Sequence, residues 1–151
     1  MDSEDIAKQA MIEREMLGHI EQALRVVLGW QPSGGKAARK LSTLRFVGQS
    51  FQRHLDRLKV MDEHAGYMKL VVDAKPHLAA TVETSKADRD KLQVTLDRVM
   101  LQMEHVSPDD SEKFDGLCEE LSRFLDALTR HTQKERELFQ EAFVREEGGS
   151  G

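Results

Sequence analysis

The sequence predicts an all-α protein, folded as one antiparallel up-down-up-down four-helix bundle. Apolar residues recur at alternating spacings of three and four, which is the period of an amphipathic helix. No segment shows the strict alternation of a β-strand, and the few prolines lie between the periodic segments. Four long helices that each carry one apolar stripe, joined by mostly short connections, are best packed as a bundle.

The helix boundaries follow from local chemistry. We expect four helices, at residues 4–29, 38–74, 77–105 and 110–145. The stretch GWQPSGGK contains Pro32 and two glycines, which end the first helix. Pro76 ends the second helix and suits the first turn of the third. In HVSPDD, Ser107 is the expected cap of the fourth helix and Pro108 its first residue. Gly66 is a weak point in the second helix.

Composition limits the classes of function. The chain has 151 residues and is expected to form a single domain over residues 1–145, with a flexible tail at 146–151. A net charge of −5 without a basic stripe argues against nucleic acid, and no apolar run is long enough for a membrane span. The acidic start and the single cysteine, Cys118, predict a cytoplasmic protein without a disulfide. No phosphate-binding motif occurs.

Each predicted stripe is apolar apart from a polar interruption. The first stripe comprises Ile12, Met16, His19, Ala23, Val26 and Trp30. The interruptions are His19 and His54 on the first two helices, Ser85 and Arg89 on the third, and His131 and Glu135 on the fourth. An isolated carboxylate on the apolar side of a helix costs several kcal/mol unless a positive group lies opposite. We therefore expect Glu135 to face a metal, an arginine or a proton.

Residue counts predict which interruptions lie at the same level. Asp62 lies beside Met61, at the edge of the second stripe, and 14 residues before Pro76. Arg89 lies 13 residues after Pro76 on the following helix. Because the two helices are expected to be antiparallel, Asp62 and Arg89 should meet. The level of His19 is left open, since by the same counting His54 is nearer to it than Asp62.

The polar residues also resemble those of a known family. A lone histidine on the first helix is followed by DEHAGYM, SKADRDKL and RHTQKERELFQEAF on the next three. In this order they resemble the hemerythrin-like (HHE cation-binding) proteins, over residues 12–145. The resemblance implies a four-helix bundle that holds non-haem iron with histidines and carboxylates. A spacing of four residues places such ligands on one face of a helix, one turn apart.

The resemblance implies roles for individual residues. His19 corresponds to the metal ligand of the first helix. His131 and Glu135 correspond to the ligand pair of the fourth helix, in the His-x-x-x-Glu spacing. Asp62 takes the place of the glutamate ligand on the second helix, with a shorter side chain.

Two hypotheses for the bundle interior follow. Leu58 and Arg89 occupy positions at which the family has histidines, so a full di-iron centre is not expected. The first hypothesis keeps one non-haem iron or zinc ion, bound by His19, Asp62, His131 and Glu135, with His54 as a candidate fifth donor. The second has no metal, and Arg89 forms an internal ion pair with Asp62 and Glu135. A planar guanidinium can bind carboxylates through two hydrogen bonds.

Each hypothesis predicts a non-enzymatic function, because no catalytic motif is present. By resemblance, the protein has a degenerate non-haem iron site and binds or senses iron, oxygen or a protein partner. The alternative is a metal-free helical scaffold or interaction module, held together by the Arg89–carboxylate cluster.

Overall fold

The computed structural model describes residues 3–33, 35–65 and 67–143. Every regular element in these ranges is helical, as predicted, and none is a strand. The elements are α1 (Ser3–Leu28), α2 (Ala37–Ala65), α3 (Tyr67–Ala74), the 3-10 turn η1 (Pro76–Leu78), α4 (Ala79–His105) and α5 (Ser111–Phe143). The predicted second helix corresponds to α2 and α3, and the third to η1 and α4. The predicted weak point at Gly66 and the predicted tail at 146–151 lie outside the described residues.

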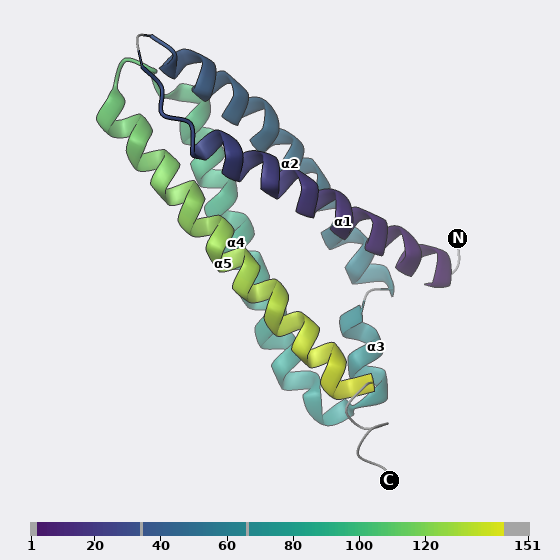
Figure 1. Ribbon diagram of the computed structural model, residues 1–151. Coiled ribbons are helices and arrows are strands. Elements are labelled where there is room, and N and C mark those ends of the chain that lie inside the picture. Colours follow the sequence, from purple (N-terminus) through teal and green to yellow (C-terminus); the bar gives the residue numbers. More distant parts are fainter. Residues whose placement is uncertain (1–2, 34, 66, 144–151) are drawn as a thin grey trace.

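The helices form two antiparallel pairs (Figure 1). Helix α1 runs beside α2, and α4 runs beside α5. The pairs lie together at the end that carries the α1–α2 and α4–α5 connections, and they diverge toward the other end. There α3 lies beyond the end of α2 and packs against the far ends of α4 and α5 (Figure 1).

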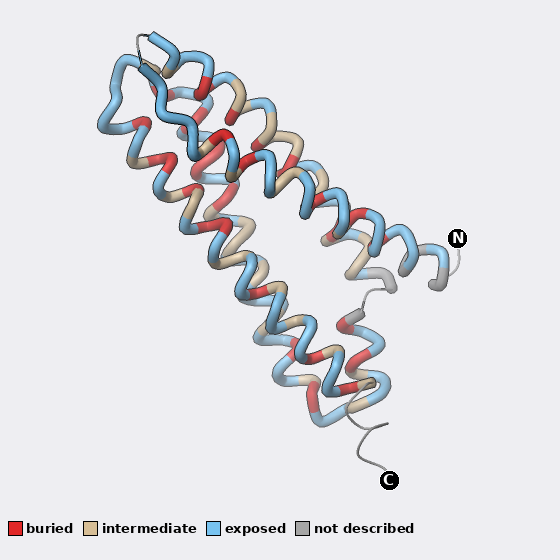
Figure 2. Tube along the Cα trace, viewed as in Figure 1, coloured by how far each residue is buried: buried red, intermediate tan, exposed pale blue. Residues whose placement is uncertain are grey.

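The diverging pairs enclose two apolar cores. The larger core lies between all four long helices and includes Leu24, Leu44, Phe51, Leu96, Leu121 and Phe124. The smaller core joins α3 and η1 to the outer ends of α4 and α5, and comprises Met68, Val71, Leu78, Val82, Leu138 and Ala142. Buried residues accordingly recur along both α4 and α5 (Figure 2). The predicted stripes of these two helices are confirmed.

The predicted stripe of the first helix is wrong by one position. The buried residues of α1 are Ala10, Glu13, Leu17, Leu24 and Val27. Ile12, Met16, His19 and Val26 lie on the exposed side of the helix. Helix α1 carries two apolar rows about 100° apart, and the row with the larger aliphatic side chains packs against the rest of the protein.

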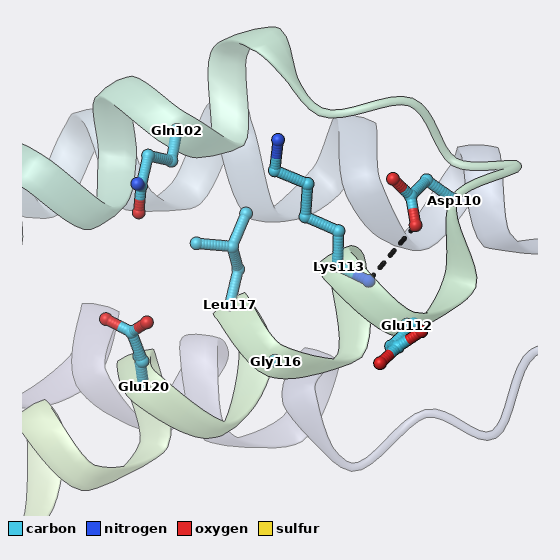
Figure 3. A pocket seen from close by; sticks show the side chains of 7 residues that line it. All are labelled: Gln102, Asp110, Glu112, Lys113, Gly116, Leu117 and Glu120. Carbon is cyan, nitrogen blue, oxygen red and sulfur yellow. Dashed lines mark hydrogen bonds between the residues drawn. The ribbon is translucent and has the colours of Figure 1, made fainter.

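The cap of the last helix also differs from the prediction. The Asp110 side chain accepts a hydrogen bond from the Lys113 backbone N–H at 3.2 Å, in the position of an N-cap (Figure 3). The Ser107 hydroxyl instead accepts from the backbone N–H of Asp109, in the turn before the helix. The cap is therefore Asp110, and Pro108 lies in the preceding turn.

Two cationic side chains of α2 cap the C-terminal ends of neighbouring helices. The Lys40 ammonium donates to the carbonyls of Leu28 and Trp30, 3.0 Å away in each case, just where α1 ends. Arg45 donates to the carbonyls of Met103 and Val106 at the end of α4. The carbonyls at the end of a helix lack partners within it, so the cations both satisfy carbonyls at the ends of α1 and α4 and complement the dipoles of these helices.

Gly48 of α2 lies against the flexible end of the Met100 side chain of α4. A β-carbon at this position would lie 2.4 Å from Cε of Met100, a distance that forces the methionine to move.

No helix among the described residues combines the length and the apolar character needed to cross a bilayer.

Candidate functional site

A cluster of charged side chains lies between the two cores. It contains Arg14 from α1, Asp62 from α2, Arg89 from α4, and His131 and Glu135 from α5. On α5 these positions separate Leu128, beside the larger core, from Leu138 in the smaller one. We call these five residues the Arg89 cluster.

Arg89 lies between two carboxylates. Its Nη1 donates to Oδ2 of Asp62 and its Nη2 donates to Oε2 of Glu135, each at 2.9 Å. The exposed fractions of the three side chains are only 15, 7 and 14 %. Asp62 and Arg89 therefore lie at the same level, as predicted, and the predicted internal ion pair is confirmed. One guanidinium ties α2, α4 and α5 together.

Arg14 completes the charge balance. Its Nη2 donates to both oxygens of Asp62, at 3.0 and 2.8 Å. Two guanidinium groups thus face two carboxylates, and the cluster is electrically neutral while His131 is uncharged. Hydrogen bonds between charged groups are shorter and stronger than those between neutral groups. The four side chains therefore hold one another in fixed positions.

His131 lies against Glu135 at the inner side of α5. Its Nε2 is 3.2 Å from Oε1 of Glu135, one turn along the same helix. The ring is 7 % exposed, and its Nε2 lacks the alignment of a hydrogen bond to any described group. The prediction that His131 faces the interior is confirmed.

The electrostatics favour the charged forms of both partners. Burial acts to lower the pKa of Arg89, but the charges of Glu135 and Asp62 outweigh it, and the pKa is raised above its ordinary value. Burial likewise acts to raise the pKa of Glu135, but contact with His131 and the charge of Arg89 hold it below its ordinary value. The pair therefore stays ionised at neutral pH.

A second pair of polar side chains joins α1 to α2 next to the cluster, since Glu13 directly precedes Arg14. His54 Nδ1 contacts Oε1 of Glu13, which sits within the buried row of α1. Sequence reasoning missed both Glu13 and Arg14, because it followed the wrong row of α1. The run of large aliphatic residues at Leu17, Ile20, Leu24 and Val27 was the signal that could have identified the buried side.

The predicted metal ligands do not come together as a set. His19 lies on the exposed side of α1 and takes no part in the Arg89 cluster, so its predicted place beside the other three is wrong. Leu58 is a buried core residue, and His54 is engaged by Glu13. Within the described ranges, no group of three or more His, Cys, Asp or Glu side chains has the arrangement of a metal site.

Cys118 packs in the larger core. Burial raises the pKa of its thiol, although the charge of Lys40 partly opposes this effect. The thiol form is a poor nucleophile and a poor metal ligand. Its position in the core is that of a packing residue.

Comparison with protein-family models, with curated proteins and with solved structures finds no match to this chain. The likeness to hemerythrin-like proteins therefore rests on the residue pattern alone.

Replacing Arg89 by methionine tests the internal ion pair. The Arg89→Met variant leaves Glu135 buried without its guanidinium, so we expect the free energy of unfolding to fall by about 3–5 kcal/mol. Urea denaturation followed by circular dichroism measures this change. Adding Glu135→Gln to the variant should restore part of the loss, because it removes the stranded charge.

The matched control is Arg98→Met on the same helix. Arg98 pairs with Glu120 at 2.8 Å, but their side chains are 51 and 33 % exposed. An exposed pair of this kind contributes at most about 1 kcal/mol. Equal losses for the two arginine variants would contradict the role assigned to Arg89.

The lowered pKa of Glu135 predicts acid sensitivity. A depressed carboxylate pKa contributes stability that is fully present above the ordinary value of 4.5 and is lost as the pH falls through the value in the folded protein. We expect the free energy of unfolding to decrease between about pH 5 and pH 3, and to decrease less in Glu135→Gln. Glu141→Gln, an exposed carboxylate of the same helix, should follow the unmodified protein.

Proposed function

We propose that this protein is a metal-free helical scaffold or interaction module, not an enzyme. The observation that carries the proposal is the position of Arg89, 2.9 Å from both Asp62 and Glu135. These carboxylates are two of the expected metal ligands, and here a side chain of the protein neutralises them. We also propose that the helices form an up-down-up-down bundle related to the hemerythrin-like proteins. This part of the proposal is supported by Asp62, Arg89 and Glu135, which lie at the same level of three helices.

The charge balance of the cluster argues against iron or zinc at this level. With Arg14 and Arg89 in place, the charges of Asp62 and Glu135 are already matched. A divalent cation would add two uncompensated positive charges to a buried region. Iron or oxygen sensing would therefore require Arg89 to leave both carboxylates, and His19 to come in from the exposed side of α1.

Metal content tests the proposal directly. After expression in medium rich in iron and zinc, we expect each metal at far below one equivalent per chain, and we expect a chelator to leave Tm unchanged. Elemental analysis and thermal unfolding give these two values. Close to one equivalent of either metal, or a chelator-dependent fall in Tm, would overturn the metal-free assignment.

The surface that such a module offers is the outer row of α1. Ile12 and Val26 are 60 and 63 % exposed, and Met16 lies between them on the same side. With His19 and Ala23 they follow the alternating spacing of a helix that packs against another helix. Isolated exposed apolar residues are common, but a continuous row along one helix is typical of an interaction surface.

The occupant in this proposal is α1 of a second copy, in antiparallel orientation. About Glu21, Met16 and Val26 are placed symmetrically, and so are His19 and Ala23. A two-fold axis there sets Met16 against Val26 and the larger His19 against the small Ala23. The charged neighbour Glu15 then faces the uncharged end of the partner helix.

Sedimentation equilibrium tests this pairing. We expect a dimer that dissociates on dilution, and at least about tenfold weaker association for the Met16→Lys/Val26→Lys variant. Val94→Lys/Leu101→Lys is the matched control, because these apolar residues are also exposed, at 68 and 58 %, but lie on α4. A monomer at every concentration, or equal association of both variants, would refute the α1 interface.

A further inference from the structure

A second feature lies away from the Arg89 cluster, at the connection between α1 and α2. An open cavity of about 380 Å³ occurs there. Its lining consists of Trp30, Gln31, Pro32, Lys36, Arg39 and Lys40. We infer that this cavity binds a small phosphorylated organic molecule with a planar group, of the nucleotide class.

Positive charge is concentrated at the cavity. Three of its six lining residues are cationic and none is acidic, although the whole chain has a net charge of −5. Among the described residues, neither Lys36 nor Arg39 has a side-chain hydrogen bond or ion pair. Both side chains are exposed and are free to contact a ligand.

Lys40 adds a buried charge to the same cavity. It is only 7 % exposed, and its ammonium donates to the carbonyls of Leu28 and Trp30. Within the described part of the chain, no carboxylate pairs with it. Carbonyl dipoles satisfy its hydrogen bonds but leave its charge unneutralised, so an anion in the cavity gains from its field.

The start of α2 strengthens this field. The helix begins at Ala37, beside Lys36, and its first turn contains no acidic residue. The N–H groups of Arg39 and Lys40 donate to the carbonyl of Lys36, and the start of this 29-residue helix carries the positive end of its dipole. Helix N-termini flanked by cations suit phosphate groups.

Trp30 supplies the surface for the planar group. It is 40 % exposed and lies beside Pro32 at the edge of the cavity. Indole rings stack with aromatic groups, including nucleobases. The cations and the indole are adjacent, so one ligand with a phosphate and a ring can contact both.

Trp30 is the only tryptophan of the chain and lines this cavity, so a ligand stacked on the indole changes the tryptophan fluorescence of the protein. The probes are ATP, inorganic pyrophosphate and adenosine. We expect ATP to change the fluorescence saturably, with a Kd that rises with salt. Pyrophosphate should bind several-fold more weakly, because it has no ring, and adenosine should give no saturable change at the same concentrations.

Charge reversal locates the binding. Lys36→Glu/Arg39→Glu should raise the Kd for ATP at least about tenfold, and calorimetry should show the same change. Arg53→Glu/Arg57→Glu, two exposed cations of the same helix outside the cavity, alters net charge equally and should leave the Kd unchanged. Circular dichroism verifies that both variants are folded.

Three results would overturn the inference. These are the absence of a saturable response to ATP, an equal Kd in the two double variants, and equal affinity for pyrophosphate and ATP. None of them depends on the metal content of the protein, and a fixed protein concentration keeps its association state the same in all measurements.

Discussion

One guanidinium holds the middle of this protein together. Arg89 reaches one carboxylate on α2 and another on α5, and the α2 carboxylate is shared with an arginine of α1. A buried ion pair of this kind adds little net stability compared with well-packed apolar side chains, because desolvation offsets the attraction. Its larger effect is on alignment. Apolar stripes can slide along one another and still bury their surface, whereas Arg89 meets both carboxylates at one relative position only.

The polar interruptions of the apolar stripes made this cluster predictable. On α4 and α5 the stripes are long and uniform, so Arg89 and Glu135 stand out as residues that need a buried partner. Pro76 gave a reference point from which Asp62 and Arg89 could be counted to the same level. The sequence therefore predicted four of the five members of the cluster, all except Arg14.

Helix α1 shows where this reasoning fails. Two rows of apolar residues run along it, and periodicity alone does not say which one is buried. Glu13 made the correct row look polar, because its partner His54 belongs to another helix and could not be seen from local sequence. Arg14 was missed for the same reason. The error also placed His19 in the interior, and with it the first ligand of the expected metal site.

The same residue types suit an ion-pair cluster and a metal site. Histidine and carboxylate side chains at a spacing of four can serve either, since both require buried polar groups on one helix face. What distinguishes them is the sign of the remaining neighbours. An arginine at the level of the carboxylates supplies the positive charge that a cation would bring, and this makes Arg89 more informative than any single histidine.

The separation of the two apolar cores affects local unfolding of the protein. A layer of charge lies between them, so few apolar contacts connect one core to the other. The smaller core involves only α3, η1 and the outer ends of α4 and α5. Local unfolding occurs most readily in regions that have few buried contacts. We therefore expect this outer part to unfold locally while the larger core stays closed, so that the two cores behave as separate cooperative units.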